Sequence, residues 1–91
     1  MNIPPITNID VALQVYYSHS ELGNKEIVKL FGRLSSATVS RLKRLAKDSM
    51  LKKGLVSYNA HRVKTDVAFE VWGIDVKDLE RRRKKRQELN L

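Results

Sequence analysis

The chain has 91 residues, which is enough for one domain with one modest hydrophobic core. It contains no cysteine, so a disulfide framework and a thiolate metal site are excluded. The formal net charge of +8 predicts a surface that attracts polyanions, either nucleic acid or an anionic lipid surface.

Several functional classes lack the residues that they need. No apolar run is long enough to span a bilayer, and no basic segment followed by an apolar one begins the chain, so we expect neither a membrane partner nor a signal peptide. His19 and His61 lack partners at metal-ligand spacing. Without a glycine-rich phosphate loop or a nucleophile–base pair, we predict no enzyme, no cofactor and no small-molecule effector.

The first predicted element is a helix that follows an extended arm over residues 1–6. Thr7 and Asp10 have the spacing of a capping box, with aspartate in place of the usual glutamate or glutamine. Apolar residues then recur at helical spacing to about His19 and predict a helix that packs on the next two: Ile9, Ala12, Leu13, Tyr16 and Tyr17. We interpret the two tyrosines as packing residues rather than as a nucleophile or a stacking platform.

Two further helices are predicted between residues 24 and 53. Residues 21–24 form a turn in this interpretation, with Asn24 as the N-cap of a helix that ends at Gly32. Ser35 is predicted to cap the next helix, which runs from Ser36 to about Lys53 and ends at Gly54. The spacing puts one set of apolar residues of the two helices on buried faces: Ile27, Leu30, Phe31, Val39, Leu42, Leu45 and Ala46.

The positive charge is concentrated in two stretches. Residues 25–53 carry nine basic and two acidic residues, and residues 81–91 carry six basic and one acidic residue. The remaining stretches, residues 1–24 and 54–80, each have a net charge of −2. Such an asymmetry is typical of a protein that binds nucleic acid through one face.

The stretch Lys25-Glu26-Ile27-Val28-Lys29-Leu30-Phe31-Gly32, followed by Thr38-Val39-Ser40-Arg41-Leu42, resembles the helix-turn-helix of bacterial and phage transcription regulators. Two departures stand out. Val28 occupies a position where the family usually has alanine, so we expect the two helices to lie slightly further apart. The segment between Gly32 and Thr38 is one residue longer than the common pattern, so the turn is not the standard one. The alternative is two ordinary amphipathic helices in a small bundle.

The resemblance implies a set of DNA contacts. The residues expected to reach base edges are Ser36, Ala37, Ser40, Arg41 and Arg44. The residues expected to contact phosphate are Lys25, Arg33, Ser35, Thr38, Lys43, Lys47, Arg62, Lys64, Arg82, Arg83 and Arg86.

Residues 55–72 allow more than one structure. Residues 55–58 and 61–64 fit two short strands of a winged helix, with a small β wing over 55–72, but they also fit an irregular loop, which we slightly favour. Residues 67–72 alternate like a strand, yet Thr65 and Asp66 before them and Gly73 after them favour a short helix. Trp72 is expected to be a core anchor on the helix-turn-helix.

Asp75 is predicted to cap a last helix that begins at Val76, with Val76 and Leu79 facing the core. Six consecutive basic residues follow at 81–86. Three interpretations stay open for them: a solvated, fraying tail, a second phosphate contact, or a membrane-surface contact, the least favoured because no apolar face accompanies the charge.

We therefore predict a mainly all-α fold, with a compact helix-turn-helix three-helix core and one or two extra C-terminal helices. Residues 1–80 form the DNA-binding domain and residues 81–91 a basic extension of the last helix. The expected function is sequence-specific binding of double-stranded DNA by a small transcription regulator of phage or mobile-element type, in the bacterial cytoplasm or nucleoid. The alternatives are a DNA-docking assembly protein for packaging or replication-origin binding, and a protein-interaction module with a basic face. A homodimer or a higher oligomer is left open.

Overall fold

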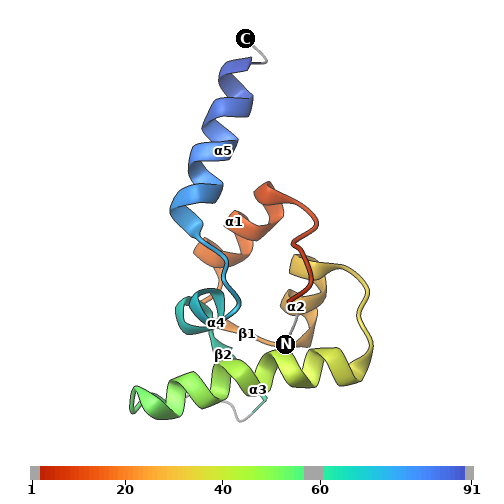
Figure 1. The fold of residues 1–91 in the computed structure, drawn as a ribbon, viewed down its shortest axis with the longest axis vertical. Helices are drawn as coiled ribbons and strands as arrows, with labels where there is room; N and C mark the ends of the chain where they lie inside the picture. The colour runs from red at the N-terminus through yellow and green to blue at the C-terminus, as the bar shows by residue number, and fades with distance from the viewer. Residues whose placement is uncertain (1–2, 57–60, 90–91) are drawn as a thin grey trace.

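The computed structural model describes residues 3–56 and 61–89. Within them, the order of elements is α1 (Ile9–Ser18), β1 (Glu21–Leu22), α2 (Asn24–Phe31), α3 (Ser36–Lys52), β2 (Val63–Lys64), α4 (Thr65–Val71) and α5 (Val76–Leu89). The predicted mainly helical, compact fold is confirmed. In Figure 1, α3 lies across one end of the molecule and α5 extends from the other end, with α1, α2 and α4 between them.

The N-cap of the first helix lies one residue later than predicted. Asn8, not Thr7, is the N-cap of α1, and its side-chain oxygen accepts from the backbone N–H groups of Asp10 and Val11. Thr7 instead donates its backbone N–H to the carbonyl oxygen of Leu30 at 2.9 Å. The contact with α2 therefore determines which of two adjacent cap-forming residues starts the helix.

The turn predicted over residues 21–24 is partly wrong. Glu21 and Leu22 form strand β1, Gly23 is the N-cap of α2, and Asn24 is the first residue of that helix. Gly32 ends α2 as predicted, with a φ of 83° that favours glycine. A Cβ on Gly32 would lie 3.2 Å from the methyl group of Thr7, which is a tight contact. The absence of a side chain at this position therefore also suits the turn.

The third helix has the predicted ends. The Ser35 side chain accepts from the backbone N–H of Thr38, and the helix ends at Lys52. Gly54 follows with a φ of 69°, and the backbone N–H of Leu55 donates to the carbonyl oxygen of Met50 at 2.9 Å. This is the hydrogen bond of a Schellman motif, which satisfies a carbonyl at the helix end.

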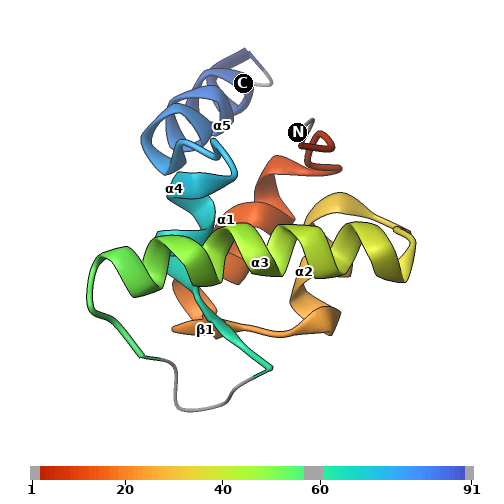
Figure 2. The ribbon, with the colours of Figure 1, turned by 60° about the horizontal axis from the view of Figure 1, so that its bottom comes forward.

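The two short strands pair with each other in antiparallel register, Glu21 opposite Lys64 and Leu22 opposite Val63. The wing alternative paired residues 61–64 with the segment 55–58. In the structure Val63 and Lys64 pair with β1 instead, and Leu55 and Val56 form no strand, as the favoured loop alternative has it for these two residues. Residues 57–60, including the predicted turn at 59–60, lie outside the described residues. Figure 2 shows β1 and β2 on one side of α3, where the chain returns after that helix.

The short helix favoured for residues 67–72 is confirmed as α4, although Thr65 lies within the helix instead of preceding it. Gly73 follows with a φ of 74°, and Ile74 donates its backbone N–H to the carbonyl oxygen of Phe69 at 2.8 Å. Asp75 then caps α5 as predicted, because its side chain accepts from the backbone N–H of Asp78 at 3.2 Å.

One core joins all five helices of the described residues. Trp72, as predicted, is buried, and its ring packs edge-on against Phe31 of α2 with the ring centroids 5.6 Å apart. Two predictions about packing are wrong. Tyr17 is 63% exposed, and Val28 is 43% exposed, so its size does not hold α2 and α3 apart. The largest fully buried side chains are Phe69, Leu13, Leu22, Ile27, Leu30, Leu42 and Val63.

Candidate functional site

The outward face of α3 is a polar and cationic stripe. Val39, Leu42, Ala46 and Met50 are buried, which fixes the rotation of the helix. The residues predicted to reach base edges all lie on the other side and are exposed: Ser36, Ala37, Ser40, Arg41 and Arg44. With 17 residues, α3 is about 26 Å long and offers this stripe without interruption by another element.

Two residues that the sequence interpretation left out continue the stripe. Asp48 lies one turn after Arg44, and Leu51 lies nearly one turn further; both are exposed. Their spacing of four and seven residues from Arg44 places them on the same face. The signal was therefore present in the sequence, but neither residue was among the predicted contacts. Asp48 puts one carboxylate among the cations of the outward face.

Lys43 lies on the flank of α3 that faces the start of α2, Lys47 follows it by one turn, and both are half-buried. The Lys43 ammonium group donates to the Asn24 side-chain oxygen at 3.0 Å. Burial, together with the nearby charge of Lys47, lowers the pKa of Lys43 below its usual value of 10.5. An anion at this flank would offset the repulsion between the two lysines.

A hollow of about 300 Å³ lies beside this flank. It is lined by Gly23, Asn24, Lys25, Glu26, Lys43, His61 and Arg62. The N-terminus of α2 opens into it, and no side chain caps that end of the helix. A helix start without a side-chain cap and its dipole favour an anion at such a position, while the Glu26 carboxylate in the lining opposes one. Three residues predicted to contact phosphate therefore come together here: Lys25, Lys43 and Arg62.

Glu26 positions Arg62 in this hollow. Its carboxylate is buried with the residue only 6% exposed, and Oε1 lies 3.5 Å from Nη2 of Arg62 and 3.8 Å from Nδ1 of His19. Glu26 was not among the residues predicted for this site. Its position one turn before Leu30 places it on the buried side of α2, which is the signal that the sequence contained.

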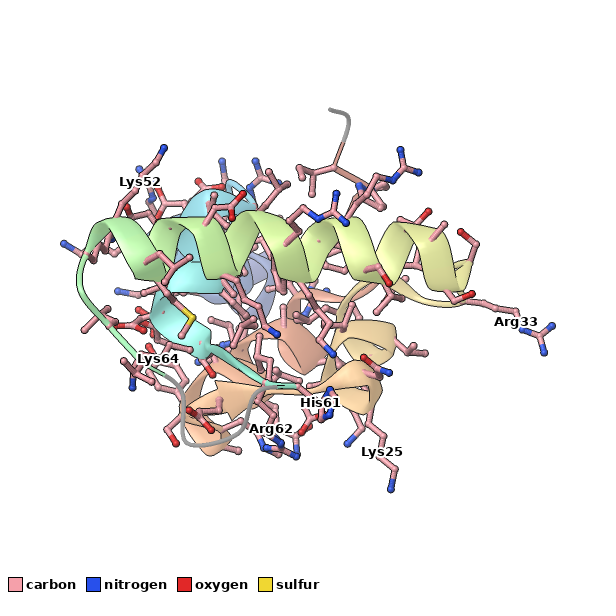
Figure 3. The ribbon with its side chains drawn as sticks, turned by 90° about the horizontal axis from the view of Figure 1, so that it is seen from below. Lys25, Arg33, Lys52, His61, Arg62 and Lys64 are labelled. Atoms are coloured by element: carbon pink, nitrogen blue, oxygen red, sulfur yellow. The ribbon has the colours of Figure 1, made fainter. Side chains whose placement is uncertain are left out.

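Further basic residues surround α3. Figure 3 shows Lys25, His61 and Arg62 along one side of the helix, Arg33 beyond its N-terminal end and Lys52 at its C-terminal end. Lys64 is half-buried in β2. The Ser35 and Thr38 hydroxyl oxygens, also predicted to contact phosphate, lie 2.9 Å apart at the start of α3.

The structure does not bring the C-terminal arginines to this face. Arg82, Arg83 and Arg86 lie on α5, at the opposite end of the molecule from α3 (Figure 1). Arg82 Nε lies 2.9 Å from Asp78 Oδ2, and Arg86 Nη2 lies 2.8 Å from Asp10 Oδ2. The predicted phosphate contacts thus form two separate groups.

The described residues contain no group of three His, Asp or Glu side chains placed to hold a metal ion. Among the same residues, no helix has both the length and the apolar character needed to span a membrane. Comparisons of the chain with known protein families, with curated protein sequences and with solved structures found no match.

Proposed function

We propose that the protein binds double-stranded DNA sequence-specifically, with α3 in the major groove, as a small transcription regulator would. The observation that carries the proposal is the outward stripe of α3, where Arg41 and Arg44 stand exposed three residues apart above a fully packed inner face. The major groove of B-DNA is wide enough for one helix, and an arginine can pair with O6 and N7 of guanine.

The surroundings of α3 support the same docking. The hollow at the start of α2 gathers Lys25, Lys43 and Arg62 around uncapped backbone N–H groups, on the flank of the reading helix. Phosphate contacts of this kind set the register of a protein on the duplex without reading the bases. Arg33 and Lys52 mark the two ends of α3 and extend the cationic border along the helix (Figure 3).

The test is a selection from random duplex DNA, followed by affinity measurements on the selected and on scrambled sequences. Each guanine contact contributes roughly 1–3 kcal/mol of discrimination, so Arg41→Ala and Arg44→Ala should lower the ratio of the two affinities by about fivefold to a hundredfold. Arg81→Ala is the matched control, because Arg81 is exposed on α5, at the other end of the molecule.

The outcomes separate the proposed role from its alternatives. An unchanged ratio in both α3 variants would mean that α3 is not the reader. Failure of the wild-type protein to bind any duplex at low salt would instead favour a protein-interaction module whose basic face meets an acidic partner.

A further inference from the structure

The second cationic surface of the protein consists of Arg83, Lys84 and Lys85 on α5, which we call the α5 cationic surface. The neighbouring arginines are already paired: Arg81 and Arg82 share Asp78, and Arg86 contacts Asp10. Among residues 3–56 and 61–89, no ion pair is found for the three members of the α5 cationic surface. Their charge is therefore available to a partner.

The α5 cationic surface has a fixed position, because α5 is attached to the body of the protein. Its three side chains are consecutive, so they spread around the helix axis, with Lys84 and Lys85 exposed and Arg83 half-buried. Leu79 is buried in the core, the Tyr17 hydroxyl group bonds to the Glu80 carboxylate, and the Arg86 guanidinium lies 2.8 Å from Asp10 of α1. The helix continues to Leu89, so residues 83–85 lie within it. Contacts on both sides of residues 83–85 hold these cations in a helix that projects from α1.

The α5 cationic surface lies away from α3. The molecule extends over 45 Å along its longest axis, with α3 across one end and the C-terminal end of α5 at the other (Figure 1). The persistence length of duplex DNA is about 150 base pairs, so a duplex does not fold back over such a small body without a large deformation. One straight duplex held by α3 cannot also contact the α5 cationic surface.

We infer that α5 binds the phosphate backbone of a second DNA duplex, so that one protein molecule bridges two DNA segments. The inference rests on the proposed function for the duplex at α3. The ligand chemistry follows from the surface itself, which has charge without an apolar seam: after Leu79, the only apolar side chain in the described part of α5 is Leu89, which is 79% exposed. Lysine and arginine side chains can bind the phosphate backbone of DNA through charge alone.

A second copy of the chain offers a weaker partner. The groove between α1, α4 and α5 is bordered by Asp66, Glu70, Asp75 and Glu80. Each carboxylate already has a partner: Glu70 contacts Lys53, Glu80 accepts from Tyr17, and the two aspartates accept backbone N–H groups at helix starts. Charge complementarity therefore favours DNA over the acidic groove of another copy.

The experiment is a capture assay with the full chain. A duplex carrying the selected sequence is fixed to beads and saturated with protein, and a fluorescent duplex without that sequence is then added and washed. The wild-type protein should retain the second duplex, with a slope of log affinity against log salt that reaches at most about −2.7, the value for three phosphate contacts. The triple variant R83A/K84A/K85A should lose this retention while its occupancy of the bead duplex is unchanged.

Two controls keep the result specific. The variant R83K/K84R/K85R keeps all three charges and should retain the second duplex, and circular dichroism should show that both variants are folded. If the wild-type protein occupies the bead duplex but captures nothing, the bridging inference is overturned while the proposed function stands. If the protein binds no duplex at all, both the bridging inference and the proposed function fail. Bridging by α5 would also be overturned if the triple variant still captured the second duplex. The same holds if the DNA-free protein sedimented as a dimer, because the two α3 helices of a dimer could hold two duplexes.

Discussion

Trp72 donates its indole N–H to the backbone carbonyl oxygen of Leu42 at 2.9 Å, which joins the end of α4 to the middle of α3. Both residues are buried, and the same indole ring packs against Phe31 of α2. One side chain from the C-terminal half therefore contacts both helices of the candidate site. The orientation of α3 therefore depends on this late part of the chain as well as on the turn between α2 and α3.

Replacing Trp72 by phenylalanine should weaken this junction without removing its aromatic packing. The variant loses one buried hydrogen bond and part of the ring volume, so the free energy of unfolding should fall by about 1–3 kcal/mol. Urea denaturation measures the change, and Val56→Ala is the control because Val56 is 82% exposed. Equal stability of the phenylalanine variant and the wild type would mean that the hydrogen bond does not support α3.

The rotation of α3 can be tested on the helix itself. Leu42 is fully buried, so Leu42→Ala should lower the free energy of unfolding by about 2–5 kcal/mol. Leu51 lies on the same helix and is 75% exposed, so Leu51→Ala should change that free energy by no more than about 0.5 kcal/mol. Similar losses for the two variants would show that the helix is rotated differently.

Local signals explain why much of the region around α3 could be predicted from the sequence. Gly32, Ser35 and Gly54 act within one turn of their own positions, and all three end or begin a helix as predicted. The apolar stripe of α3 is long enough to fix its period, so the exposed set that includes Arg41 and Arg44 was found as well.

Long-range contacts explain what the sequence did not reveal. Strand β1 has two residues and pairs with Val63 and Lys64 some forty positions later, so neither alternation nor a nearby turn indicated it. Asn8 and Thr7 are both good caps, and only the bond from Thr7 to Leu30 decides between them. The separation of the α5 arginines from α3 is a property of the tertiary fold, which charge counting along the chain does not contain.

The lowered pKa of Lys43 predicts how DNA affinity depends on pH. A phosphate at this flank binds the charged amine, so affinity should begin to fall as the pH rises toward 10.5, before an exposed lysine would lose its proton. Folding stability should move the other way in this window, because the unfolded chain holds the Lys43 proton to higher pH than the folded chain does. Titration of Lys43 therefore does not itself unfold the protein in this window, and circular dichroism at each pH checks that the fold persists.

Lys43→Arg is the matched variant for this measurement, because arginine stays charged throughout the range. Dissociation constants at a series of pH values up to about 10 should show an early loss of affinity in the wild type that the arginine variant lacks. The same duplex serves both proteins, so titration of the DNA bases cancels. Identical pH profiles would place the phosphate away from Lys43.

Asp48 gives the last prediction, because it is the one carboxylate on the outward face of α3. If this face enters the major groove, Asp48 lies near phosphates that repel it, and a carboxylate there can accept a hydrogen bond from the N4 amino group of cytosine. Asp48→Asn should then bind random duplexes more tightly than the wild type, while its preference at one base position of the selected sequence becomes weaker.

The matched control is Asp66→Asn, which removes the same charge at the start of α4. It keeps the side-chain oxygen that accepts from the backbone N–H of Val67, so the helix start is preserved. Titrations of both variants against random and selected duplexes compare the two sites at equal net charge. If Asp66→Asn strengthens binding as much as Asp48→Asn does, the gain reflects net charge alone, and the outward face of α3 is not the surface that meets the DNA.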